Sequence, residues 1–363
     1  MHAGDQRLPS SGARPATATA AGPPPGSATL ARANGRSAIV PPMRLAAAHA
    51  PWADTVLACR REFVRTARAF WLVPEPIPLP ARDDVALLYC FCRRLDDAVD
   101  EAREPAEARA ALERWRDELS GRASPRPLVA AFLASAGRAR LPLACLDPLL
   151  DGMASDLGPV RVADDAALLR YAYRVSASVG LLLAPLLGVR DAAAEHRVVD
   201  LGLALRLSNV LLGVRGDARR DRVYLPATRL AAAGLDGDDV LAAPDHPRLG
   251  PVLRGLAALA DRYYESALAG VASVPLRYRH GVVLLARAYG DLGRRAARGR
   301  AAPEVPAGLP FAAMALRLGA LAATAWHPHT LGLVAPPPHD PSLHRALAGW
   351  PGVDAPAPRA PAV

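Results

Sequence analysis

Four acidic residues within six positions follow an apolar stretch that ends at Leu95. On a helix, Asp96 and Asp100 lie one turn apart on one face, with Cβ atoms about 5–6 Å apart, and Asp97 and Glu101 form a second such pair. Carboxylate oxygens at this spacing suit Mg²⁺ shared with substrate phosphates. The alternative is a solvated acidic helix end. Acidic residues are unfavourable near a helix C-terminus, which argues against this alternative.

A second polar cluster lies at residues 205–226, where an apolar run leads into an Arg-rich stretch. Arg219, Arg220 and Arg222 stand beside Asp217, and guanidinium groups match the oxygens of a diphosphate. Arg93, just before the first acids, is placed to contact the same anion. A salt-bridged helix terminus is the alternative interpretation of the second cluster.

The elements that must position these clusters are predicted to be helices. Apolar residues recur at helical spacing, no run alternates as a strand does, and no fixed-period repeat is present. Val179–Val189 and Val199–Leu212 are apolar on nearly all sides, which places them at the centre of a large all-α domain. The helical runs are Asp84–Leu95, Ala106–Leu119, Asp165–Leu187, Ala192–Val214, Leu249–Val271 and Leu276–Arg298.

Composition indicates the extent of the folded domain and the classes of partner that are expected. Residues 1–42 and 335–363 are rich in Pro and Ala and are expected to be unstructured, which leaves one domain at 43–334, opening at Met43. The net charge is +9 and every basic residue is arginine. Because aromatics are only 5% and no helix carries a clean basic stripe, we expect no nucleic acid partner.

Cellular context follows from cysteines and hydropathy. The four cysteines lack a second pair at zinc spacing and are expected to be reduced core residues of a cytoplasmic monomer. Residues Leu309–Trp326 form a long apolar segment interrupted by Arg317. We interpret it as a buried helix, with peripheral membrane contact as the alternative.

Four motifs, in this order and spacing, carry a resemblance that spans roughly residues 60 to 300. The sequence resembles the squalene/phytoene synthase family. The motifs are C-R-R-L-D-D-A-V-D-E at 92–101, G-M-x-x-D-L at 152–157, Y-x-x-x-V-x-x-S-V-G at 171–180, and N-V-L followed by G-D-A-R-R-D-R-V-Y-L-P within 209–226.

The resemblance implies a fold and a reaction. The fold is a single-domain isoprenoid synthase-type helical bundle around a central apolar cavity. The reaction joins two prenyl diphosphates head to head through a cyclopropylcarbinyl diphosphate, with Mg²⁺, or Mn²⁺, assisting loss of diphosphate. Phytoene from geranylgeranyl diphosphate is favoured; squalene, dehydrosqualene or presqualene diphosphate from farnesyl diphosphate are alternatives, as is a non-catalytic prenyl diphosphate-binding or assembly protein.

Site residues also follow from the resemblance. It implies catalytic roles for three acids, two metal sites, and a set of diphosphate and prenyl contacts. The catalytic acids are Asp96, Asp100 and Asp217; the metal ligands are Asp96, Asp97, Asp100 and Asp217, with Asp221 as a further candidate; the substrate contacts are Phe70, Arg93, Tyr171, Val175, Gly180, Asn209, Arg219, Arg222 and Tyr224.

The second acidic motif departs from the family pattern. Gly213 stands where the first Asp is usual, Gly216 replaces the Glu, and Arg206 replaces an amide. Three interpretations follow. One metal site works, with Arg206 or Arg215 partly replacing the missing cation; or Asp217 and Asp221 form a shifted pair on a longer helix; or the chain is a non-catalytic homologue. Phe70 follows Ala69, where the family has Ser.

Overall fold

The computed structural model describes residues 51–66, 78, 81–102, 104–299 and 335–354. Met1–Arg44 and Leu45–Val363 form two separate units, and every described residue belongs to the second. Phe70, the segment Leu309–Trp326 and the N-terminal residues 1–42 lie outside the described residues, so the expectations for them stay predictions.

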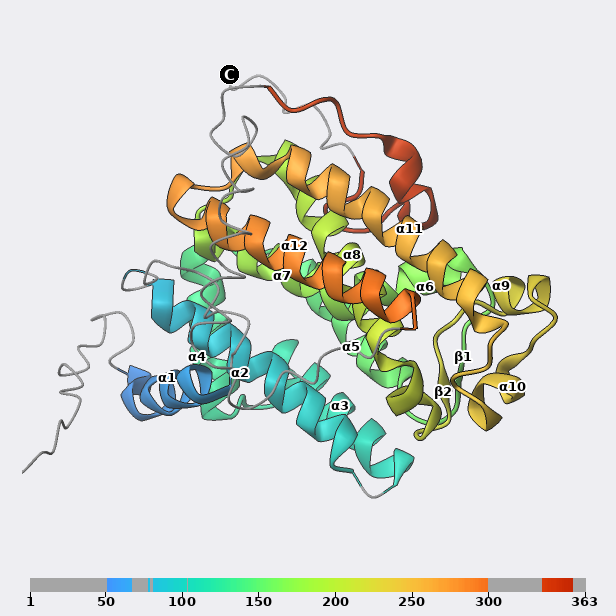
Figure 1. The fold of residues 1–363 in the computed structure, drawn as a ribbon. Coiled ribbons are helices and arrows are strands. Elements are labelled where there is room, and N and C mark those ends of the chain that lie inside the picture. The colour runs from blue at the N-terminus through green and yellow to red at the C-terminus, as the bar shows by residue number, and fades with distance from the viewer. Residues whose placement is uncertain (1–50, 67–77, 79–80, 103, 300–334, 355–363) are drawn as a thin grey trace, which may run out of the picture. The chain divides into compact units, whose positions relative to one another are not determined.

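Helices build nearly all of the described part (Figure 1). Five of the six helical runs predicted from the apolar spacing are present as single helices with ends shifted by a few residues, and the sixth, Asp165–Leu187, is divided into several helical pieces. The helices are α1 (Ala53–Thr66), α2 (Ala81–Asp100), α3 (Pro105–Leu119), α4 (Pro127–Ala139), α5 (Leu146–Ser155), α6 (Asp165–Ala172), α7 (Ser178–Leu183), α8 (Ala192–Ala218), α9 (Ala227–Ala232), α10 (Gly237–Ala242), α11 (Leu249–Ala269) and α12 (Leu276–Ala297).

Helix α8 is the centre of the bundle. It packs against α7, α11 and α12, and Figure 1 shows α11 and α12 side by side across it. Val199, Leu203 and Leu207 of α8 are fully buried. A helix can bury all its sides only when neighbours surround it, so the run that is apolar on nearly all sides takes the central position. The all-α fold is confirmed.

A π-helical turn interrupts the rod predicted at Asp165–Leu187. Residues Tyr173–Ala177 form this turn between α6 and α7. The backbone of this turn closely approaches α8: a Cβ atom on Gly202 would lie 2.5 Å from the Cα of Ala177. The absence of a side chain at Gly202 therefore permits the close contact that fixes Val175 and Gly180 relative to α8.

Two short strands were not predicted. β1 (Val160–Arg161) and β2 (Arg222–Val223) pair in parallel, with Val160 opposite Arg222. Two residues are too few for an alternating pattern to be visible in the sequence. The pairing holds the segment after α8 beside the turn after α5, and so brings Arg222 and Tyr224 to Asp156.

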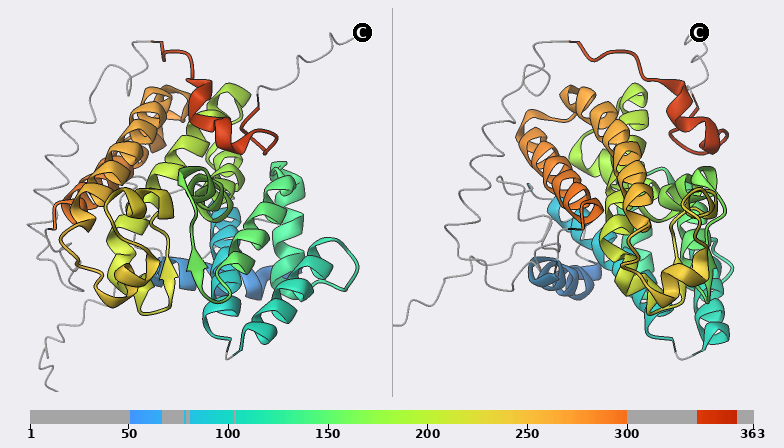
Figure 2. Two further views of the ribbon diagram at one scale, coloured as in Figure 1. Left: turned by 90° about the vertical axis from the view of Figure 1, so that its right-hand side faces the viewer. Right: turned by 45° about the vertical axis from the view of Figure 1, so that its right-hand side comes forward.

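The expectation of an unstructured C-terminal segment is wrong for residues 335–354 (Figure 2). A 3₁₀-helix forms at Pro341–Leu347, and Leu343, Leu347 and Val353 enter the core. The Tyr263 hydroxyl donates to the carbonyl of Leu343 over 2.8 Å. The prediction failed because the prolines around the segment outweighed a few apolar residues in the sequence pattern. Those few residues are enough to dock the segment on an existing core.

Candidate functional site

Helix α2 ends in the predicted acids. Asp96 and Asp100 share one exposed face of its last turns, and Asp96 also lines an apolar cavity. Protein atoms that displace water from the Asp96 carboxyl, and then repulsion from Asp100, raise the pKa of Asp96 to about 6, although Arg93 and Arg206 offset part of the rise. A cation bound between the two carboxylates would relieve this repulsion.

Asp97 lies on another face of α2 and is already paired. Its Oδ1 lies 2.8 Å from Arg93 Nε in an ion pair, and its Oδ2 accepts from Arg94 Nη1 at 2.8 Å. Asp97 lines a separate, open depression of about 720 Å³ beside α1 and α3. Both oxygens of Asp97 are in ion pairs on a side of the helix away from the Asp96–Asp100 face, and its role as a metal ligand stays a prediction.

The two predicted clusters meet at Asp100. Guanidinium nitrogens of Arg220 and Arg222 each lie 3.9 Å from Asp100 Oδ1. Arg219 is exposed on the same segment. The end of α2 and the Arg-rich stretch after α8 therefore form two sides of one polar region, although they are far apart in the sequence.

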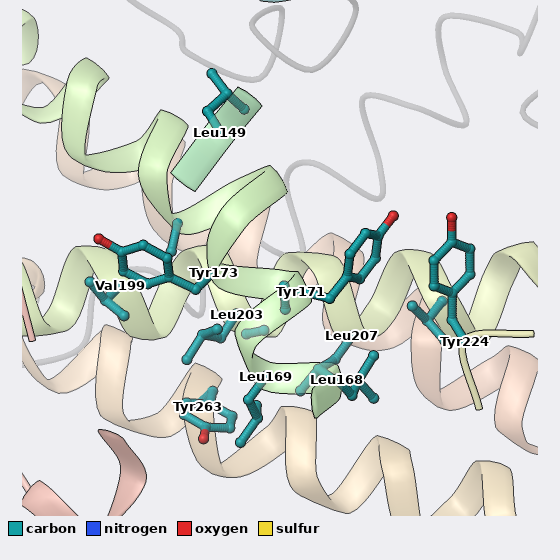
Figure 3. Close-up of a cluster of buried hydrophobic side chains, with 14 of the residues drawn as sticks. Leu149, Leu168, Leu169, Tyr171, Tyr173, Val199, Leu203, Leu207, Tyr224 and Tyr263 are labelled. Atoms are coloured by element: carbon teal, nitrogen blue, oxygen red, sulfur yellow. The ribbon is translucent and has the colours of Figure 1, made fainter. Parts of the chain in front are cut away.

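A hydrogen-bonded network under this region depends on Asp156. Its carboxylate accepts from the hydroxyls of Tyr171 (2.9 Å) and Tyr224 (2.7 Å), and its backbone carbonyl accepts from Arg222 (2.8 Å). The two phenol rings stack with centroids 4.7 Å apart, and Figure 3 shows their hydroxyls pointing the same way. Asp156 was not predicted as a site residue, although it lies in the motif at 152–157, which was the available signal in the sequence.

Arg206 is held at the centre of this network. Its Nη2 donates to the Tyr171 hydroxyl, and its guanidinium lies 4.8 Å from the ring centroid of Tyr171 and 5.3 Å from that of Tyr224. Burial by itself would lower the pKa of Arg206, but Tyr171, Tyr224, Asp156 and Asp217 outweigh it and raise the pKa. The group is therefore a fixed positive charge.

The carboxylate of Asp217 lies against Gly213, in space that a side chain at position 213 would occupy. A Cβ atom on Gly213 would lie 2.6 Å from Asp217 Oδ2, one turn along the same face of α8. Burial raises the pKa of Asp217, while Arg206 and Arg222 oppose the rise. Arg215 forms an ion pair with Asp245 at 2.8 Å, so of the two arginines considered as replacement cations only Arg206 faces this site.

The shifted pair of Asp217 and Asp221 is excluded. Helix α8 ends at Ala218, and Asp221 has a φ of 57°, which no helical residue adopts. Its carboxylate accepts from Arg161 at 2.5 Å. The β1–β2 pairing turns the chain away one turn earlier than the pair requires, so Asp221 is not a ligand beside Asp217.

The cavity that opens at Asp96 has a volume of about 430 Å³. This lies within the roughly 300–1,000 Å³ typical of small-molecule sites. Of the predicted prenyl contacts, Val175 and Gly180 line the cavity, whereas Tyr171 is buried in the Asp156 network and does not line it. Asn209 is exposed on α8, one turn beyond the lining residue Leu205. Its walls are mostly aliphatic: Val179, Leu183, Leu187, Val198, Leu201, Leu205, Val271, Val274 and Leu285.

The two sides of the region differ in their fitness for a metal. Asp96 and Asp100 offer exposed oxygens on one helical face and repel each other, which a divalent cation would relieve. Asp217 stands among Arg206, Arg220 and Arg222, and no second carboxylate lies one turn before it. The residues present fit a metal on the α2 side and do not fit one on the α8 side.

A sequence profile described as squalene/phytoene synthase matches residues 63–309. The chain belongs to the squalene/phytoene synthase family. As a member, this squalene/phytoene synthase homologue is a prenyltransferase. No helix in the described ranges has the length and apolar character needed to cross a membrane.

Individual relatives agree with the family assignment. The phytoene synthase of Cereibacter sphaeroides is 36% identical over 254 residues, covering 66% of this chain and 71% of that protein. The presqualene diphosphate synthase of Zymomonas mobilis is 33% identical over 231 residues, covering 62% and 79%. The crystal structure of a dehydrosqualene synthase in complex with ligand matches with a TM-score of 0.66 at 21% identity, covering 76% of this chain and 98% of that one, which is a likeness of fold.

Proposed function

We propose that the protein joins two prenyl diphosphates head to head, with geranylgeranyl diphosphate as substrate and phytoene as product. The observation that carries the proposal is the position of Asp96, which belongs both to the acidic face of α2 and to the wall of the apolar cavity. A diphosphate at the acids thereby has its prenyl chain directed into an aliphatic pocket. Phytoene synthases among the relatives favour the longer substrate.

The residues of the chain have distinct roles in this proposal. Asp96 and Asp100 hold Mg²⁺, or Mn²⁺, which supplies charge to the departing diphosphate. Arg220 and Arg222, next to Asp100, bind diphosphate oxygens together with the exposed Arg219, and Arg93 remains a candidate contact at the edge. The aliphatic walls exclude water from a carbocation.

Arg206 takes the place of a second metal in this proposal. Its guanidinium is fixed by Tyr171 and by the stacked ring of Tyr224, so it needs no reorganisation when negative charge develops. Asp217 and Asp156 balance its charge. This arrangement supports an active enzyme over a non-catalytic homologue, because the fixed arginine supplies charge where the acid of Gly213 is missing.

A product assay tests the proposal. Purified full-length protein is incubated with geranylgeranyl or farnesyl diphosphate and Mg²⁺, and the extracted hydrocarbons are identified by mass spectrometry. We expect phytoene from the longer substrate; squalene, dehydrosqualene or presqualene diphosphate from the shorter one would support the alternative products. Diphosphate binding without turnover of either substrate would show a non-catalytic homologue.

Two substitutions on α2 give the test its residue-level control. Asp96→Asn and Asp100→Asn should each lower turnover by about 100-fold or more while the protein stays folded, since the exposed carboxylates contribute charge and not packing. Asp147→Asn, an exposed acid on α5, should leave turnover unchanged. Equal losses in all three variants would argue against a metal on the α2 face.

A further inference from the structure

A group of histidines lies away from the acidic region, where the C-terminal segment docks. His196 comes from the first half of α8, and His339 and His344 come from residues 335–354. The ring centroids are 4.5–5.7 Å apart. One nitrogen of each ring lies within 4.8 Å of the others, and among the described residues this is the one such group of three metal-binding side chains.

A buried carboxylate orients two of the rings. Asp200, one turn after His196 on α8, has a fully buried side chain. Its Oδ1 lies 2.9 Å from His344 Nε2, its Oδ2 lies 3.1 Å from His339 Nε2, and Ser266 donates to Oδ2 over 2.6 Å. Because a carboxylate only accepts, both Nε2 atoms carry the proton, and the lone pair of each ring is on Nδ1.

Two of these imidazole nitrogens have nothing to bind. The Nδ1 atoms of His344 and His196 are buried without a hydrogen-bond partner, and His344 is only 3% exposed. A buried polar atom without a partner is destabilising, so two of them on rings whose centroids are 5.7 Å apart call for an explanation. Hydrogen bonding to Asp200 accounts for the Nε2 atoms of His339 and His344 and leaves the Nδ1 atoms of His196 and His344 unexplained.

We propose that His196, His339 and His344 form a binding site for Zn²⁺ or a similar transition metal, with Asp200 orienting the ligands from behind. Histidine ligands of a metal ordinarily donate their other ring N–H to a carboxylate, and His339 and His344 both do. Imidazole nitrogens favour Zn²⁺ and disfavour Mg²⁺, so this site is chemically distinct from the acids of α2. Nitrogens in a tetrahedral zinc site lie about 3.3 Å apart, which small ring rotations would reach.

The site would fasten the C-terminal segment to the wall of the cavity. Arg197, beside His196, lines the cavity and donates to the carbonyl of Pro337 over 2.6 Å. Metal ligands contributed by both α8 and residues 335–354 therefore join the segment to the helix whose other half carries Arg206. A metal bound only by the folded protein stabilises it.

Metal analysis of the untagged full-length protein tests the site. After chelation and dialysis, the protein is titrated with Zn²⁺ in the presence of excess Mg²⁺, and bound zinc is measured by mass spectrometry. We expect one zinc per chain, a rise of the thermal midpoint, and, with Co²⁺ as the probe, the visible absorption bands of a tetrahedral site. An absence of bound zinc and of cobalt bands in the wild-type protein would overturn the proposal.

Variants locate the metal. His339→Gln, at the partly exposed edge of the group, should lose the stoichiometric zinc while circular dichroism shows a folded protein, and Asp200→Asn should weaken binding by about 10–100-fold. His246→Gln, a histidine in the turn before α11, is the matched control and should bind as the wild type does. Zinc that survives His339→Gln and is lost on Asp96→Asn would place it at the acids and contradict the histidine site.

Discussion

Arg206 is the residue on which the unusual half of the site depends. Replacing it by the amide usual in the family, Arg206→Gln, removes a charge that faces both Asp96 and Asp217. We expect turnover to fall by about 100-fold, because a preorganised charge on a developing anion is worth that much. Steady-state kinetics of the variant and the wild-type protein with the same substrate would measure the change in turnover. If Arg206→Gln leaves turnover unchanged, Arg206 has no role in the reaction.

The same residue permits a rescue experiment. In Arg206→Gln combined with Gly213→Asp, the acid one turn before Asp217 is restored and the most strongly acting of the nearby arginines is removed, so a metal is expected to bind on the α8 side. Turnover should recover from the level of Arg206→Gln and should depend more steeply on Mg²⁺ concentration. Gly216→Ala in the Arg206→Gln background is the control, since it adds no carboxylate and should not restore activity.

The sequence predicted the members of the site better than their contacts. The spacing of Asp96 and Asp100, and the Arg-rich segment ending at residue 222, identified two regions that the structure brings together. The ion pairs of Asp97 and the role of Asp156 could not be predicted, because they depend on which side chains the packed helices place opposite each other. Spacing along one helix carries no information about a partner from another.

At the scale of the elements, two glycines on α8 allow the effect of close packing to be compared with the effect of helix propensity. Gly202→Ala would place a Cβ 2.5 Å from the backbone of Ala177, so the π-helical turn and α8 must move apart. We expect a loss of about 1–3 kcal/mol in the free energy of unfolding. Gly216→Ala meets nothing within 4 Å and should stabilise by up to about 1 kcal/mol through helix propensity. Urea unfolding followed by circular dichroism compares the two variants, and equal effects would argue against the close contact.

A second element-scale prediction concerns pH. Glu118 of α3 accepts from the backbone N–H of Arg126 (3.0 Å) and from its guanidinium (2.6 Å to Oε1). Burial opposes ionisation of Glu118, but these contacts outweigh it and lower its pKa. Since the folded pKa lies below the unfolded one, this stabilisation is present above the unfolded pKa and disappears as the pH falls through the folded pKa. Glu118→Gln should therefore cost about 1–2 kcal/mol at pH 7, and less in acid.

Unfolding titrations of Glu118→Gln at neutral and acid pH measure this difference. Glu113→Gln, on the same helix, is the control: its carboxylate is exposed and 3.7 Å from Arg116, so the expected change is below about 0.5 kcal/mol at either pH. A cost for Glu118→Gln that does not change with pH would mean that the ionisation of Glu118 does not contribute to stability.

The whole molecule shows where periodicity fails as a guide. The long helices α2, α8, α11 and α12 were predicted, because burial on one side leaves regularly spaced apolar residues and burial on all sides leaves a nearly continuous apolar run. The π-helical turn, the β1–β2 pair and the C-terminal segment were not, because a few residues each, stabilised by tertiary contacts, leave no period to detect.

The C-terminal segment gives the last prediction, because its apolar residues belong to the main core. Leu347 is fully buried there, so Leu347→Ala should lower the free energy of unfolding by about 2–5 kcal/mol, as a leucine in any other part of the core would. Leu276→Ala, on a leucine that is 58% exposed, should change it by less than about 0.5 kcal/mol. Both variants are compared by urea unfolding with chelator present, which keeps any metal at the histidines from contributing. If Leu347→Ala costs no more than Leu276→Ala, the segment does not remain docked in solution, and the histidine site would then lack two of its three ligands.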